Sequence, residues 1–120
     1  AQIVRAALES MAYQTHDLAT AYANDGAKWE CLRIDGGMSA NDWLAQDIAD
    51  ILNLPVERPQ FVETTALGAA VAAATGIGWF DDLKSASEAM RGEVDRFEPQ
   101  MDEAVRSERL ARWAKALAAA

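Results

Sequence analysis

The chain has 120 residues, of which 51% are hydrophobic and 25% charged, and its formal net charge is −8. This length allows one domain with a hydrophobic core, and the composition excludes a disordered tail. Residues 1–80 and 81–120 are both net acidic, so the clustered Lys and Arg that neutralise a phosphate backbone are missing and we expect no nucleic-acid partner.

The first third of the chain predicts a helix followed by a strand. Apolar residues recur at steps of three and four over about residues 3–22, which predicts one face of an amphipathic helix. The segment of residues 29–34 is short and mixes apolar with polar residues, and residues 35–37, Asp-Gly-Gly, end it. This pattern predicts a strand that runs into a tight loop.

A second helix and a second strand follow this loop. Ser39 is expected to be the N-cap of the helix, with Asp42 as a shortened capping-box acid. The helix should end near Asn53, before the short strand that residues 55–59 supply between two prolines. A strand, helix and strand in this order predict a parallel pair of strands. Two strands alone make a poor sheet, so we expect further strands upstream of residue 1.

The last part of the chain predicts three helices. Residues 65–74 are almost all small and apolar, so a helix there is expected to be buried on several sides. A weaker helix is predicted over 83–90. The apolar stripe of the final helix consists of Leu110, Trp113, Ala114 and Leu117.

The chain carries no sign of a disulfide framework or of a membrane segment. Cys31 is the single cysteine, which fits a reducing cytoplasm. The longest apolar stretch, residues 66–74, is too short to span a bilayer, and no signal segment opens the chain. The chain starts inside a helical pattern without Met and ends in alanines. We therefore expect a cytoplasmic protein without a membrane partner, and a piece of a longer chain.

The loop at residues 35–41 is the candidate for chemistry because it joins a strand to a helix start through Gly36 and Gly37. Glycines allow close backbone approach, and the NH groups and dipole of a helix N-terminus favour an anion. The loop matches neither the P-loop nor the dinucleotide fingerprint. Spacing alone therefore leaves two interpretations open, an anion site and a plain tight turn.

Several runs carry a resemblance to a known family. They are Asp35-Gly36-Gly37-Met38-Ser39-Ala40-Asn41, Val56-Glu57-Arg58-Pro59, Glu63-Thr64-Thr65-Ala66-Leu67-Gly68-Ala69-Ala70 and the opening Gln2-Ile3-Val4-Arg5-Ala6-Ala7-Leu8-Glu9. Together they resemble the closing part of the FGGY carbohydrate kinases. The second and third runs favour the glycerol kinase branch over the pentulose and gluconate kinases.

The resemblance implies a nucleotide site with few residues in this chain. It implies that Gly37, beside Gly36, approaches the phosphates through its backbone and that Asn41 lies beside the adenine. Met38 and Ala40 would line the pocket with apolar contacts. The family's catalytic Asp and its glycerol contacts have no match in this chain, so we expect no catalytic residue and no metal ligand here.

The resemblance also implies a fold and a reaction. Residues 1–120 would form one partial domain, the latter half of an actin-like, ribonuclease-H-like α/β domain, with a β-α-β unit of parallel strands plus C-terminal helices. The parent would use ATP with Mg to phosphorylate glycerol, and the chain alone would be inactive and would bind nucleotide weakly at most. Alternatives are another FGGY sugar kinase, another actin-like ATPase, and a helical interaction module. We also expect self-association of the fragment through exposed apolar surface, or a homo-oligomeric parent.

The remaining notable residues are interpreted as structural. Asp35 is expected to brace its loop by accepting backbone NH bonds, not to act as a base. His16 is expected at the surface and Cys31 as a buried structural thiol. The four tryptophans are expected to pack between elements, and the alternating charges of residues 103–112 predict a solvated helix face.

Overall fold

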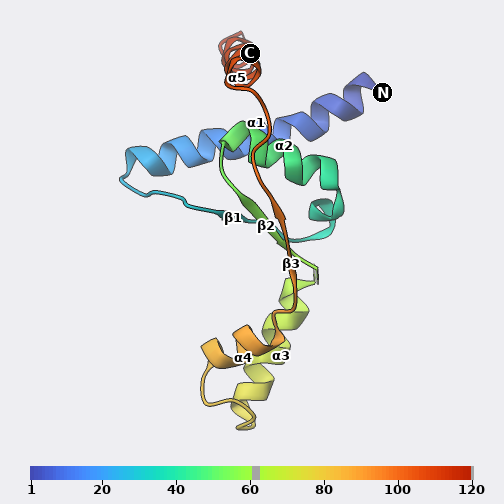
Figure 1. The fold of residues 1–120 in the computed structure, drawn as a ribbon, viewed down its shortest axis with the longest axis vertical. Coiled ribbons are helices and arrows are strands. Elements are labelled where there is room, and N and C mark those ends of the chain that lie inside the picture. Colours follow the sequence, from blue (N-terminus) through green and yellow to red (C-terminus); the bar gives the residue numbers. More distant parts are fainter. Residues whose placement is uncertain (61–62, 120) are drawn as a thin grey trace.

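The computed structural model describes residues 1–60 and 63–119. The elements in chain order are α1 (Gln2–Asn24), β1 (Leu32–Arg33), the 3₁₀ turn η1 (Gly37–Ala40), α2 (Asp42–Leu52), β2 (Val56–Pro59), α3 (Thr64–Gly76), α4 (Leu83–Met90), β3 (Val94–Phe97) and α5 (Glu103–Leu117). α2 packs on the sheet and α1 packs on α2, α5 stands at one end of the molecule, and α3 with α4 projects at the other (Figure 1).

The sheet contains the predicted parallel pair. β1 pairs with β2 in parallel, with Leu32 opposite Val56, and the two strands are joined through α2. The amide of Leu32 donates to the carbonyl of Pro55 at 2.9 Å, and that of Ile34 to Glu57 at 2.9 Å. The β-α-β unit is confirmed, although the first strand covers only Leu32–Arg33 and not the whole of residues 29–34.

A third strand, β3, was not predicted from the sequence. It pairs antiparallel with β2 along its whole length, from Val56 opposite Phe97 to Pro59 opposite Val94, so β2 is the central strand. The four residues of β3 include two charged ones, so the sequence of this strand shows no clear alternation of apolar and polar residues. The strand forms because β2 offers it a complete ladder, and that pairing is not local in sequence. The prediction of helices alone after β2 was therefore wrong.

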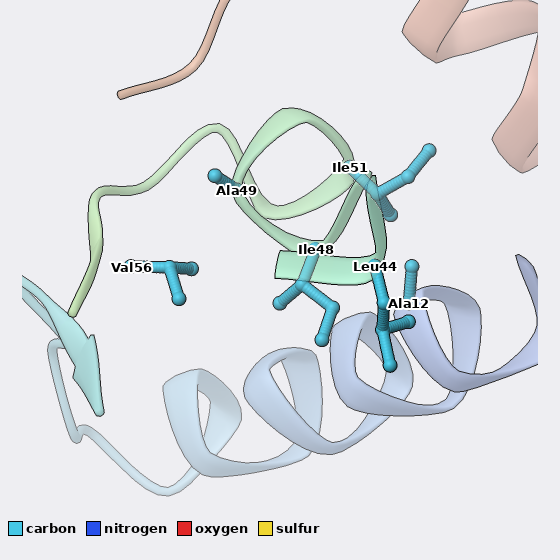
Figure 2. Close-up of a cluster of buried hydrophobic side chains, with 6 residues drawn as sticks. All are labelled: Ala12, Leu44, Ile48, Ala49, Ile51 and Val56. Carbon is cyan, nitrogen blue, oxygen red and sulfur yellow. The ribbon is translucent and has the colours of Figure 1, made fainter. Parts of the chain in front are cut away.

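The hydrophobic core lies between α1, α2 and the sheet. Its buried members are Ala12, Leu44, Ile48, Ala49, Ile51 and Val56. Figure 2 shows Ala12 of α1 beside Leu44 of α2, with Val56 of β2 at the other end of the cluster. Four of the six come from α2, so this helix holds the core together and fixes the position of the loop that precedes it.

The alanine-rich helix α3 is less buried than predicted. Within Thr64–Gly76 only Val71 and Ala74 are buried. The helix extends beyond the sheet and packs mainly on α4, so most of its surface is left uncovered by the other elements that the structure describes (Figure 1). The exposed side chains of Ile77 and Trp79 continue this apolar surface.

The predicted solvated face of α5 is only partly solvated. Arg106 is buried, and its guanidinium donates to the carbonyl of Asp50 at 2.7 Å and to the side chain of Asn53 at 3.0 Å. Arg109 is half-buried and pairs with Asp47. Alternating charge in sequence does not show which cations meet acceptors on α2, and these two do.

The tryptophans divide into two groups. Trp113 stacks on Tyr13 at 5.2 Å, and Trp29 lies against Tyr22 at 5.6 Å, which confirms packing between elements. Trp43 and Trp79 are 44% and 76% exposed, so for these two the packing prediction is wrong within this chain.

The two isolated reactive side chains are only partly accessible. His16 is intermediate in exposure, less open than the predicted surface position. Cys31 is half-buried, and desolvation raises the pKa of its thiol, which suits the predicted structural role. Among the helices that the structure describes, none is long and apolar enough to cross a membrane.

Candidate functional site

The candidate loop forms a tight 3₁₀ turn between β1 and α2. Gly36, the N-cap residue just before it, has φ +83° and ψ 172°, a conformation open in practice to glycine alone. The amide and the hydroxyl of Ser39 both donate back to the carbonyl of Gly36, at 3.0 and 2.7 Å. The amide of Asn41 donates to Met38 at 3.2 Å. The turn is therefore closed by its own hydrogen bonds.

The N-cap of α2 is Asn41 and not Ser39. The side-chain oxygen of Asn41 accepts from the amide of Leu44 at 3.2 Å, as an N-cap residue does. Ser39 is buried inside the preceding turn, where its hydroxyl is used. The inserted 3₁₀ turn moves the helix start by two residues. Asp42 is therefore in the first helical turn and not at the third position of a capping box.

Gly36, Gly37, Met38 and Asn41 all lie on this one exposed turn. Apart from the adjoining residues of the chain, no atom of the described residues lies within 4 Å of the position that a Cβ would take on either glycine, and Met38 is 52% exposed. The first NH groups of a helical turn have no acceptor inside the helix. The turn can therefore bring backbone donors close to an anion, with the side-chain amide of Asn41 and the side chain of Met38 beside it.

Asp35 braces a different element from the one expected. The hydroxyl of Thr64, at the start of α3, donates to the Asp35 carboxylate. Among the described residues, Asp35 accepts from this hydroxyl and from no backbone NH of residues 36–41. Asp35 therefore ties the end of β1 to α3, and its position between two elements suits a structural role.

One contact to the turn, and the residue that supports it, could not be predicted from the sequence. Arg58 of β2 donates to the carbonyl of Ser39 at 2.8 Å, and Asp95 of β3 accepts from the same guanidinium at 2.8 Å. The sequence motif that contains Arg58 indicates the family, but it does not indicate a contact with the turn. Asp95 gave no signal, because the strand that carries it was not predicted.

A second feature lies where β1 and β2 end. Residues of both strands and of α3 line a hollow of about 310 Å³, and Glu57 in its wall is surrounded by cations. Its carboxylate pairs with Arg33 at 3.2 Å, Arg96 at 2.9 Å and Arg91 at 3.8 Å. The hydrogen bond from Arg33, followed by the one from Arg96, lowers the pKa of Glu57 below its ordinary value of 4.5.

The lowered pKa of Glu57 predicts acid sensitivity. The stabilisation is complete above the ordinary glutamate pKa and is lost as the pH falls through the lowered value, because protonation removes the charge that the arginines bind. We expect Glu57→Gln to flatten the fall in melting temperature between pH 5 and pH 3. The control is Glu98→Gln, which removes an exposed partner of Arg96 and should leave the pH profile as it is. If the melting temperature depended on pH in the same way in the unmodified protein and in both variants, this role of Glu57 would be contradicted.

The comparison with family models identifies the domain. Residues 1–77, which include β1, the turn, α2 and β2, match the model described as the FGGY family of carbohydrate kinases, C-terminal domain. The chain belongs to the FGGY carbohydrate kinases. The Gly-Gly turn and its helix thus lie within the matched part of this FGGY domain, whereas α4, β3 and α5 lie beyond it.

The curated relatives of this FGGY chain are named glycerol kinase. The protein from Pseudothermotoga lettingae is 51% identical over 117 residues, which cover 96% of this chain and 23% of that protein. The protein from Brucella ovis is 50% identical over 116 residues, covering 94% and 23%. The chain therefore spans about a quarter of the length of the curated relatives it matches.

Solved structures agree with the fold. The Plasmodium falciparum glycerol kinase with ADP superposes with a TM-score of 0.79 at 35% identity, covering 96% of this chain and 23% of that one. The xylulose kinase from Lactobacillus acidophilus superposes with a TM-score of 0.74 at 23% identity, covering 98% and 25%, which supports the fold alone. The expected fold class, part of an actin-like, ribonuclease-H-like α/β domain, is confirmed, with a mixed sheet in place of a purely parallel one.

Proposed function

We propose that this chain is the C-terminal, nucleotide-binding portion of an ATP-dependent glycerol kinase. The observation that carries the proposal is the identity of about half of all residues to glycerol kinases over nearly the whole chain. The complete enzyme transfers the γ-phosphoryl group of ATP to a terminal hydroxyl of glycerol, giving sn-glycerol 3-phosphate and ADP. The share of those relatives that this chain covers leaves the rest of the active site to other parts of the enzyme.

The nucleotide is proposed to lie on the exposed turn. The backbone at Gly36 and Gly37 meets the α-phosphate end, since neither glycine has an atom within 4 Å of its Cβ position. The NH₂ group of Asn41 remains a donor toward the base while its oxygen caps α2. Met38, half-exposed beside it, contributes an apolar contact. An ADP-bound structure among the relatives supports nucleotide use in this family.

This chain contributes positioning to the reaction and no acid, base or metal ligand. Phosphoryl transfer depends mainly on orientation and charge neutralisation. No three His, Cys, Asp or Glu side chains among residues 1–60 and 63–119 gather into a metal site. We propose that Mg arrives on the phosphates of ATP and neutralises charge there, and that the catalytic base and the glycerol contacts come from the other parts of the enzyme.

The isolated chain is expected to be inactive and to self-associate. Large apolar side chains of α1 and of the segment after α3 are exposed, among them Ile3 at 86% and Trp79 at 76%. Patches of this kind are covered in a complete protein. We propose that residues 1–120 form one partial domain whose exposed faces meet the remainder of a cytoplasmic enzyme. The rival proposal, a helical interaction module, lacks an observation of its own.

A substrate comparison on the full-length protein tests the proposed function. With saturating MgATP, we expect kcat/KM for glycerol to exceed that for xylulose and for gluconate by at least about 100-fold, a difference of about 3 kcal/mol in transition-state binding. Coupled detection of ADP release measures all three. A preference for either sugar substrate would assign the chain to another branch of the family, and ADP release without any acceptor would favour an ATPase.

A further inference from the structure

Arg58 connects three separate elements through one guanidinium. The side chain is 11% exposed and lies over the ring of Phe97, with its Cζ 5.1 Å from the ring centroid. Nη1 donates to the carbonyl of Ser39 in η1 at 2.8 Å and lies 2.8 Å from the carboxylate of Asp42 in α2. Nη2 donates to Asp95 of β3 at 2.8 Å. The strand β2 thus holds both sides of the junction between turn and helix.

Ser39, which accepts the hydrogen bond from Arg58, is itself hydrogen-bonded to Gly36. Ser39 is 4% exposed, and both its amide and its hydroxyl donate to the carbonyl of Gly36. A displacement of the Ser39 carbonyl would therefore also move Gly36, the residue just before the turn. The guanidinium fixes this carbonyl relative to β2, which is held on both sides by β1 and β3.

We propose that Arg58 is the positioning residue of the nucleotide-binding turn and that Asp95 holds Arg58 in place. The inference rests on the proposed function, because it assigns a role at the same turn. Asp95 lies outside residues 1–77, the part that the family model matches. The third strand thereby supports the nucleotide site from beyond the matched domain, and its ladder with β2 places Asp95 directly opposite Arg58.

Only an arginine can serve this junction. A guanidinium presents five donors in a rigid planar fork, whereas an ammonium is a compact point charge that cannot reach acceptors on three elements at once. The hydrogen bond with Asp95, followed by the one with Asp42, raises the pKa of Arg58, so the cation persists at every working pH. Lysine therefore keeps the charge and loses the bridge, which makes it the informative substitution.

The test uses the full-length protein with Arg58→Lys and Asp95→Ala. We expect Arg58→Lys to raise KM for ATP by about tenfold, because a charge-assisted hydrogen bond to the turn is lost. For Asp95→Ala we expect an increase of about threefold, since Arg58 keeps its two other partners. KM for glycerol should stay within about twofold in both variants, because only the nucleotide turn moves.

Arg96→Lys is the matched control. Arg96 lies next to Asp95 on β3 and pairs with Glu57 and Glu98 on the other side of the ladder, away from the turn. This variant should keep both KM values. A merely structural role for Arg58 would lower the melting temperature and the active fraction of Arg58→Lys while both KM values stayed as in the unmodified protein, and that result would overturn the proposal.

A second readout separates the two levels of inference. If the unmodified full-length protein failed to phosphorylate glycerol, the proposed function would fail. Calorimetric titration of the same three variants with ADP would still measure the positioning effect. A dissociation constant for ADP that rose about tenfold in Arg58→Lys and not in Arg96→Lys would support the role of Arg58. An equal constant in all proteins would overturn it.

Discussion

Replacing Arg109 by Met is expected to lower the free energy of unfolding by about 3–5 kcal/mol, the usual cost of leaving a buried charge without its partner. Asp47 of α2 is 5% exposed and receives the guanidinium of Arg109, with Nη2 and Oδ2 3.0 Å apart. Methionine fills a similar volume but cannot donate, so the carboxylate stays buried and unpaired. Urea unfolding followed by circular dichroism measures the change.

The effect is large because Arg109 joins three helices. Its Nε donates to the hydroxyl of Tyr13 in α1 at 2.9 Å, and its Cζ lies 5.2 Å from the centre of that ring. The bond to Asp47, then the bond to Tyr13, raises the pKa of Arg109, so the cation is kept at any pH of interest. The substitution therefore removes one link of α5 to α1 and one link of α5 to α2.

Two further variants distinguish this explanation from a general loss of charge. Arg112→Met, on an exposed position of the same helix, should change the free energy of unfolding by no more than about 0.5 kcal/mol. The double variant Arg109→Met with Asp47→Leu should regain most of the loss, because no unpaired charge remains. If Arg109→Met were as mild as Arg112→Met, the ion pair would not stabilise the fold as described.

The parts of the fold that local patterns encode could be predicted from the sequence. The period of α1 and the strand, helix and strand around α2 are written in consecutive residues, and the structure confirms them. β3 and the burial of Arg106 could not be predicted, because each depends on a ladder or an acceptor that is distant in sequence, from Pro59 opposite Val94 in the ladder to Arg106 on the carbonyl of Asp50. For α3 the composition predicts burial, but among the described residues only Val71 and Ala74 of this helix are buried.

The candidate site was predictable in its outline and not in its details. Two glycines before a helix predicted a tight turn, and the resemblance pointed to Gly37 and Asn41 within it. The sequence placed the helix cap at Ser39, because Ser is a good cap and an intervening 3₁₀ turn has no distinctive residue pattern. The contact of Arg58 with the turn could not be predicted for the same reason as β3, because Asp95, the partner of Arg58, lies on that strand.

The two adjacent glycines of the turn are expected to respond differently to alanine. Gly36 has φ +83°, so Gly36→Ala should cost about 1–3 kcal/mol in folding free energy through backbone strain, whatever space surrounds it. Gly37 begins the 3₁₀ turn without a positive φ, and nothing lies within 4 Å of its Cβ position. Gly37→Ala should therefore fold with unchanged stability. Thermal unfolding of the two full-length variants measures this difference.

Kinetics then show whether a ligand occupies the open space at Gly37. If the phosphates of ATP approach this backbone, the added methyl group prevents the closest contact, and we expect KM for ATP to rise by about tenfold or more in Gly37→Ala, with KM for glycerol unchanged. Gly76→Ala, which adds a methyl group at another open glycine, at the end of α3, is the control and should leave KM for ATP unchanged. Because no protein atom meets the new methyl group, a stable Gly37→Ala enzyme with an unchanged KM for ATP would mean that the nucleotide binds elsewhere.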